Sequence, residues 1–155
     1  MGTVINRKTF AVSVLLAIVI CSSMVYSHCQ IPCGIYNDRA RFDMMAEHIT
    51  TIEKAIKQVV MLSERDEPNT NQIVRWVQNK EKHADELSHI VTYYFMSQRI
   101  KPTEKTSGKA YTEYTKQLTL LHKILIYTMK TRQTTDLANV EKLRSLLDEF
   151  KTEYF

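Results

Sequence analysis

Apolar side chains recur at alternating three- and four-residue steps along four segments of the chain after residue 38. This spacing keeps one stripe of an α-helix facing a core. The first stripe, in a helix expected from Arg39 to about Glu64, consists of Phe42, Met45, Ile49, Ile52, Ile56 and Val59. The second begins with Ile73, Trp76 and Val77, thins through Lys80 and Ala84, and resumes at Leu87, Val91, Tyr94 and Phe95.

Two further stripes follow the loop expected over residues 103–109. The third consists of Tyr111, Tyr114, Leu118, Leu121, Leu125 and Met129, and the fourth of Leu137, Val140, Leu147, Phe150 and Tyr154. Pro68 and Lys101-Pro102 end the first two helical patterns, and Thr134-Thr135-Asp136 offers N-cap side chains to the last. Residues 37–155 are therefore predicted to form an all-α fold, an antiparallel up-down-up-down four-helix bundle.

The composition agrees with one helical domain and limits the classes of partner that we expect. The chain has 155 residues with only 3 Gly and 3 Pro, and 25% of its residues are charged. Arg7 and Lys8 account for two of the 21 basic residues, so residues 28–155 carry 19 basic and 17 acidic side chains. No run of basic residues interleaved with aromatic ones occurs, so we expect no nucleic-acid partner.

Residues 1–27 have the three parts of a cleaved signal peptide. A basic start precedes an apolar run over residues 10–20 and a short polar end. The apolar run is too short for a stable helix across a bilayer. Small, uncharged side chains, as signal peptidase requires, stand at Val25 and Ser27, so we expect cleavage after Ser27 and export to the periplasm or outside the cell, with no stable membrane association afterwards. The alternative is an uncut membrane anchor.

The nine residues that follow, His28–Tyr36, concentrate the metal-binding chemistry and are called the hook below. They read His-Cys-Gln-Ile-Pro-Cys-Gly-Ile-Tyr. Cleavage after Ser27 gives residue 28 a free α-amine beside its imidazole. Cys29 adds an amide nitrogen and a thiolate, and Cys33 adds a second thiolate across a turn that the neighbouring proline and glycine permit.

Two nitrogen and two thiolate donors in one plane suit nickel(II) or copper(II) better than tetrahedral zinc. The His28 imidazole could approach along the axis as a fifth ligand. An amide nitrogen binds a metal only when it is deprotonated, and such a strongly donating set stabilises a higher oxidation state. A one-electron redox cycle is therefore plausible for nickel.

With His-Cys-x-x-Pro-Cys-Gly-x-Tyr ahead of a four-helix bundle, residues 28–155 resemble nickel-containing superoxide dismutase. The resemblance implies an enzyme with one nickel ion per subunit and superoxide as its substrate. In the implied ping-pong cycle, one superoxide reduces Ni(III) to Ni(II) and leaves as dioxygen. A second superoxide reoxidises the nickel and leaves, with two protons, as hydrogen peroxide. The family also implies a homohexamer and a processing peptidase, which in some members is a dedicated enzyme inside the cell, so a cytoplasmic location is the alternative to export.

The resemblance assigns roles to residues of the hook. His28 binds nickel through its amine and, in the oxidised state, through its imidazole. Cys29 binds through its amide nitrogen and sulfur, and Cys33 through its sulfur. Tyr36 matches the family tyrosine that closes over the open axial face and helps to position the small anion.

The resemblance also implies support from the bundle. Asp43 matches a carboxylate of the first helix that holds the axial imidazole, although the family often has the longer glutamate there. Arg75 matches an arginine of the second helix that holds this carboxylate. Arg39 and Arg41 are candidates for the mild positive potential that would attract superoxide.

Two other interpretations of the hook remain open from the sequence. An exported pair such as Cys29 and Cys33 could close a disulfide, and the hook could sequester copper or nickel without catalysis. The protein would then be a non-enzymatic metal-binding or interaction protein. The remaining histidines are interpreted as surface or interface residues: His48, His83, His89 and His122. Glu86 and His89 form one Glu-x-x-His step, which a di-iron bundle needs twice.

Overall fold

The structure, a computed structural model, describes residues 10, 13–14, 16 and 31–155. The chain divides into two units, Met1–Ile31 and Pro32–Phe155. In the first unit Phe10, Ser13, Val14 and Leu16 are helical and exposed, and the predicted cleavage site after Ser27 lies outside the described residues. No helix in the described ranges combines the length and the apolar character needed to cross a bilayer.

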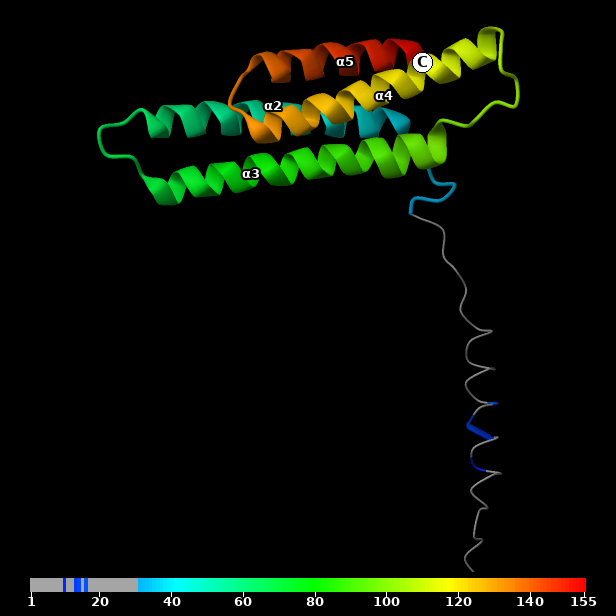
Figure 1. The fold of residues 1–155 in the computed structure, drawn as a ribbon, viewed down its shortest axis with the longest axis horizontal. Helices are drawn as coiled ribbons and strands as arrows, with labels where there is room; N and C mark the ends of the chain where they lie inside the picture. Colours follow the sequence, from blue (N-terminus) through cyan, green and yellow to red (C-terminus); the bar gives the residue numbers. More distant parts are fainter. Residues whose placement is uncertain (1–9, 11–12, 15, 17–30) are drawn as a thin grey trace, which may run out of the picture. The chain divides into compact units, whose positions relative to one another are not determined.

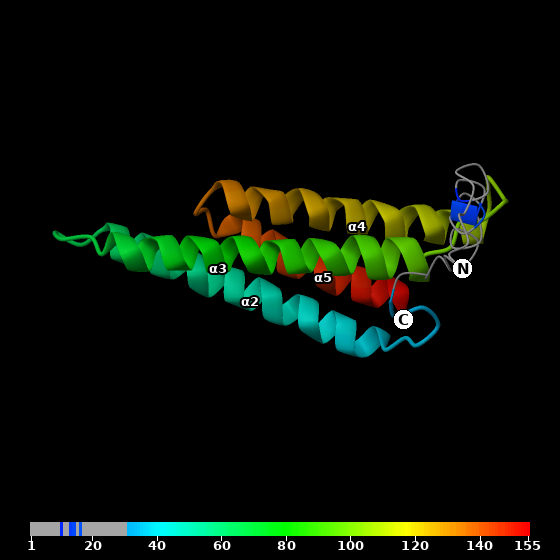
Figure 2. The same cartoon turned by 90° about the horizontal axis from the view of Figure 1, so that it is seen from below.

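The second unit is a helical bundle. Its helices are α2 (Asp38–Ser63), α3 (Thr70–His89), the π-helix η1 (Ile90–Arg99) that continues α3, α4 (Lys109–Gln133) and α5 (Ala138–Tyr154). They alternate in direction along the bundle (Figures 1 and 2), and α2 packs on α3 and α5 while α4 packs on α5 and α3. Residues 31–155 contain no strand. The predicted fold class is confirmed.

Side-chain caps explain where α2 and α3 begin. The Asn37 side chain accepts a hydrogen bond from the Ala40 amide at 3.1 Å, and Asn69 does the same for Gln72 at 3.2 Å. Asp136 accepts from the Ala138 amide at 2.9 Å, but the N-cap position of α5 is Leu137, which makes no side-chain cap bond. These caps satisfy amides that have no partner inside the helix. The first helix ends at Ser63, one residue before the predicted limit.

The core joins the predicted stripes of α2 and α5 to the second half of the α3–η1 helix. In α2 the pattern is correct except at its end, where Val59 is half-buried and Leu62 is buried. At the start of α3 the prediction is less accurate, because Ile73 and Trp76 are half-buried and Val77 is exposed. Figures 1 and 2 show the reason: the α2–α3 pair extends past the ends of α4 and α5, which leaves this part of α3 one neighbour only.

The stripe of α4 is rotated from the predicted one. Tyr111 and Met129 are 39% and 46% exposed, and the buried positions are Leu120, Leu121, Ile124, Thr128 and Thr131. The two threonines can be buried because each hydroxyl donates to a carbonyl of its own helix, Thr128 to Ile124 at 2.8 Å and Thr131 to Thr128 at 2.7 Å. Satisfied hydroxyls lose little on burial.

Lys80 explains why the second stripe thins in its middle. Its side chain is 6% exposed, and its Nζ donates to the backbone oxygen of Arg132 at 2.6 Å. Burial lowers the pKa of Lys80, while nearby Glu81 acts in the opposite direction. The buried ammonium thus caps the carboxyl end of α4 from a neighbouring helix.

The last ten residues of the second helical pattern form a π-helix, which the sequence pattern did not predict. In η1 the backbone hydrogen bonds span five residues, as at its end, where the Ile100 amide donates to the Phe95 oxygen. Residues five apart share a face in this helix, whereas in an α-helix they point about 140° apart. The pair Tyr94 and Arg99 is therefore brought to one face, which points at the start of α2.

Candidate metal centre

The turn that carries Cys33 leads into the bundle. The Ile35 amide donates to the Pro32 oxygen at 2.8 Å, and Gly34 has φ +84°. A positive φ at the third position of such a turn, as in type II turns, is reached readily only by glycine. Cys33 lies at the second position and is exposed. The Pro-Cys-Gly sequence thus forms the predicted turn, with the predicted thiolate donor on its surface.

The other predicted ligands lie outside the described residues. These are His28 and Cys29, so the structure places one member of the proposed donor set. The Cys33 side chain is exposed and so can be reached from solvent. The donor set of an amine, an amide nitrogen and two thiolates stays a prediction.

Tyr36 packs against the end of the bundle. Its ring meets that of Tyr94 edge to face, with centroids 5.8 Å apart. The guanidinium carbon of Arg99 lies 4.4 Å from the centroid of the Tyr36 ring, within cation–π range. Tyr36 is 37% exposed. The residue expected to position the substrate anion is thus held by two side chains of η1.

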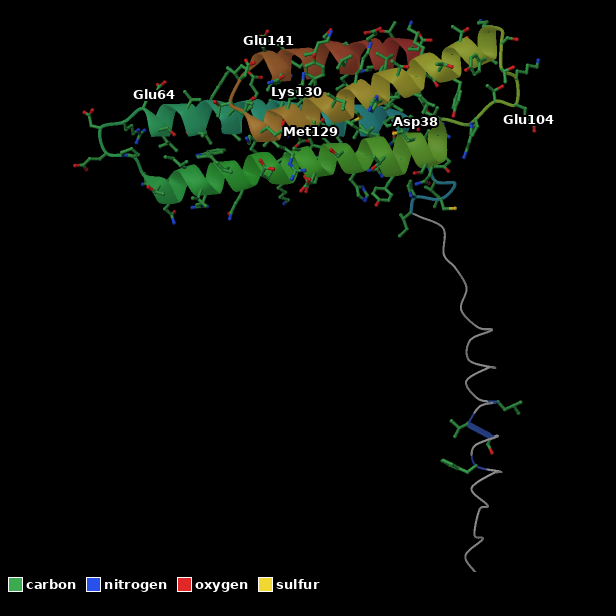
Figure 3. The ribbon with its side chains drawn as sticks, in the orientation of Figure 1. Asp38, Glu64, Glu104, Met129, Lys130 and Glu141 are labelled. Carbon is green, nitrogen blue, oxygen red and sulfur yellow. The ribbon has the colours of Figure 1, made fainter. Side chains whose placement is uncertain are left out.

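A carboxylate fixes those two side chains. Asp38 Oδ1 accepts from the Tyr94 hydroxyl at 2.7 Å and from Arg99 Nε at 2.8 Å. Its Oδ2 accepts from Arg99 Nη2 at 2.7 Å and from the Tyr154 hydroxyl at 2.9 Å. Figure 3 labels Asp38 at the beginning of α2, directly after the hook. We call Tyr36, Asp38, Tyr94, Arg99 and Tyr154 the platform.

The electrostatics of the platform favour its charged pair. Burial alone would raise the pKa of Asp38, but the hydrogen bonds from Arg99, Tyr94 and Tyr154 outweigh it and hold that pKa below its ordinary value. Burial and the hydrogen bond to Asp38 raise the pKa of Tyr94 to about 12. The hydrogen bond to Asp38 also raises the pKa of Arg99. At neutral pH the carboxylate and guanidinium are ionised and the phenols are neutral.

Two arginines beside the platform are not paired with a carboxylate of residues 31–155. The guanidinium of Arg39 lies 4.9 Å from the ring centroid of Phe155, and that of Arg41 lies 5.0 Å from the ring centroid of Tyr94. Neither forms an ion pair with any residue from 31 to 155. Arg99, in contrast, is paired with Asp38. The end of the bundle that follows the hook therefore presents two unpaired positive charges.

The predicted Asp43–Arg75 pair is not brought together within the chain. Both residues are exposed, and neither side chain makes a hydrogen bond or an ion pair with the described residues. Asp43 is near the start of α2 and Arg75 near the start of α3, which runs the opposite way, so they lie about 20 Å apart along the bundle. The relation of Asp43 to His28 stays a prediction, because His28 lies outside the described residues.

The platform residues Asp38, Arg99 and Tyr154 were missed by the sequence reasoning as site residues. Tyr94 was interpreted as core, and it is indeed buried. The contributions come from three helices, and the link between Tyr94 and Arg99 depends on the π-helical spacing of η1. The sequence could have indicated Asp38 only through its position, which is one residue after an N-cap asparagine and two after Tyr36.

Comparison with known proteins adds one finding. A family model described as nickel-containing superoxide dismutase matches residues 23–155. Searches of curated proteins and of solved structures give no match. The matched range includes the whole hook and the whole bundle, so it connects the predicted ligands to the helices that carry the platform.

Proposed function

Because the chain belongs to the nickel-containing superoxide dismutase family, we propose that the hook binds the nickel ion once the chain has been cut after Ser27. Membership of the family makes the protein an oxidoreductase that disproportionates superoxide with a nickel cofactor. The observation that carries the proposal is the turn that presents Cys33 directly ahead of Tyr36 and the platform.

The ligands in this proposal come from three residues. His28 contributes its amine and imidazole, Cys29 its amide nitrogen and sulfur, and Cys33 its sulfur. Bound nickel would supply one-electron chemistry between Ni(II) and Ni(III), as in the ping-pong cycle expected from the resemblance. The glycine of the turn supports this arrangement, because it lets the chain reverse immediately after the Cys33 thiolate.

The substrate is a small anion, and the chain's own residues would guide and hold it. Arg39 and Arg41 attract superoxide through their unpaired charges. Tyr36, held between Tyr94 and Arg99, presents its hydroxyl in a defined direction. Superoxide takes up one electron and two protons when it becomes hydrogen peroxide. The raised pKa of Tyr94 keeps this phenol neutral, so its proton stays in the platform.

Asp43 keeps its proposed role toward the His28 imidazole, without Arg75 as its partner. It is exposed on the first turns of α2, the helix that follows the hook. An Asp43→Asn variant that loads nickel normally but shows altered activity would support this role. Unchanged activity and an unchanged nickel spectrum would remove it.

Assembly and location complete the proposal. We propose a homohexamer of bundles, which is supported by apolar side chains exposed on α2, α3 and α4: Met44, Met61, Val74, Val77, Ile126 and Met129. Sedimentation equilibrium measures the assembly directly, and a monomer at micromolar concentration would contradict it. We also propose export before use, supported by the pattern of residues 1–27. The alternative is removal of the leader by a dedicated peptidase inside the cell.

The decisive experiment compares two proteins that differ by one residue. One begins at His28, and the other retains Ser27, so that its His28 nitrogen is an amide rather than a free amine. Both are loaded with nickel, and superoxide decay is followed by pulse radiolysis. We expect activity and a Ni(III) electron paramagnetic resonance signal from the first only. Equal activity, or activity that survives Cys29→Ser or Cys33→Ser, would refute this ligand set.

A further inference from the structure

A second group of side chains of the kinds that bind metals lies between α2 and α3, far from the hook in the sequence. His48 comes from α2, and His83 and Glu86 come from one face of α3, three residues apart. Both histidines are predicted from the sequence to be surface or interface residues rather than ligands, but the His48 side chain is only 11% exposed and that of His83 only 20% exposed. The Glu86 carboxylate is 41% exposed.

One possible ligand atom of each side chain lies close to those of the other two. His48 Nδ1 and His83 Nδ1 are 2.9 Å apart, and Glu86 Oε2 lies 3.5 Å from the first and 3.6 Å from the second. A point equidistant from these atoms in their plane lies about 1.9 Å from each, and zinc–nitrogen and zinc–oxygen bonds measure about 2.0–2.2 Å. A small displacement of an ion out of this plane gives all three bonds their normal length.

We propose that His48, His83 and Glu86 form a second metal site, which binds a divalent ion of the zinc class. Two imidazole nitrogens and one carboxylate oxygen are the protein ligands of many zinc sites that keep a fourth, open position. Thiolates are absent from this set, so its preference differs from that of the hook. The proposal does not depend on the function of the hook.

Access to the triad agrees with this assignment. A surface pocket of about 330 Å³ opens beside the triad, lined by Arg41, Met44, His48, Glu86, His89 and Ile90. A water molecule in it can serve as the fourth ligand. Lys82 Nζ lies 3.7 Å from the other oxygen of Glu86 and helps to orient this carboxylate.

The same three side chains could instead share protons in a hydrogen-bonded chain without any ion. With Nδ1 atoms at 2.9 Å, one imidazole would donate to the other. Three observations favour the metal. Two ring nitrogens and a carboxylate oxygen lie within 3.6 Å of one another, the three residues come from two packed helices, and a pocket opens beside them.

Zinc titration of the nickel-loaded protein that begins at His28 tests the proposal. We expect one zinc ion per chain at micromolar free concentration, with the nickel content unchanged, and a zinc-dependent rise in melting temperature. His83→Ala should weaken zinc binding at least about 100-fold, and Glu86→Gln about tenfold. Glu86→Gln is the variant with the least effect on folding, because its side chain is well exposed. His122→Ala, which changes an exposed histidine of α4, is the matched control and should bind zinc normally.

The result can also overturn the proposal. If the protein takes up no zinc at 100-fold molar excess, or binds it equally well after His83→Ala, the triad is a hydrogen-bonded pair with a neighbouring carboxylate. Repeating the titration with Cys29→Ser/Cys33→Ser protein separates the two sites. Zinc bound there and lost with His83→Ala belongs to the triad, even if the hook fails to bind nickel.

Discussion

Asp38→Asn is the substitution whose effect follows most directly from the platform. The asparagine has almost the same size but no charge, and its NH₂ cannot accept hydrogen bonds. Arg99 then keeps a positive charge without its partner in a site where the two side chains are only 17% and 29% exposed. Hydrogen bonds to a charged group contribute about 1.5–3 kcal/mol, and two Arg99 donors are affected, so we expect a loss of about 2–3 kcal/mol after allowing for solvent screening.

The loss is measured by urea unfolding of the metal-free protein, with Asp43→Asn as the control. Asp43 belongs to the same helix, but its exposed side chain has no partner among the described residues. A loss of this size corresponds to a fall in melting temperature of about 6–12 °C for a domain of this length. An Asp38→Asn penalty under about 0.5 kcal/mol, equal to that of Asp43→Asn, would refute the argument.

The same variant has a pH signature. The pKa of Asp38 is lower in the folded protein than in the unfolded chain, so its contribution is complete above the unfolded value, about 4. As the pH falls through the folded value, the carboxylate takes up a proton and the contribution is lost. The difference in unfolding free energy between wild type and Asp38→Asn should be constant from pH 8 to 5 and shrink below about pH 4. A difference that stays constant down to pH 3 would show that charge is not its source.

Three other substitutions test separate parts of the structure. In Gly34→Ala the added carbon has free space, but the backbone must keep a φ of +84°. We therefore expect about 1 kcal/mol of strain in the turn. The variant should lose nickel to a chelator more readily, with an unchanged melting temperature. Tyr36→Phe keeps the ring contact with Tyr94 and should retain nickel but lower kcat/KM up to about tenfold, whereas equal activity would exclude the hydroxyl from the reaction. Lys80→Met preserves the packing but removes the donor to the Arg132 oxygen, which should cost about 1–2 kcal/mol in urea unfolding; no loss would show that solvent replaces this bond.

The sequence predicted the fold well because apolar spacing and helix-ending residues agree along the bundle. Pro68 correctly predicts the α2–α3 connection, which lies between Ser63 and Thr70. The pattern failed where burial depends on hydrogen bonding rather than on hydrophobicity. Thr128 is buried because its hydroxyl reaches a carbonyl of the same helix, and Met129, the more apolar residue, faces outward. No scale of side-chain hydrophobicity contains this information.

The family and its nickel cofactor could be predicted from the sequence, whereas the side chains that hold Tyr36 could not. The hook is contiguous, so residue types and their spacing are visible without a fold, and the match to the family model agrees with it. A supporting ion pair between helices depends instead on which positions lie at the same level of the bundle. Arg75 has a suitable charge but lies at a different level of the bundle from Asp43. Arg99 binds Asp38 although the two residues are 61 positions apart in the sequence.

The π-helix also has a consequence for how related chains should be aligned. In η1 the residues that bind Asp38 are five apart, but a chain one residue shorter could present the same pair four apart in an ordinary α-helix. The extra residue would fall between Tyr94 and Arg99, and the exposed Ser97 is the position whose removal disturbs packing least. If no gap is permitted in this segment, the alignment pairs Arg99 with the wrong residue of the shorter chain. The equivalent of Arg99, which holds Tyr36, is then overlooked. A one-residue deletion here should therefore be tolerated, while one in the middle of α2 should not.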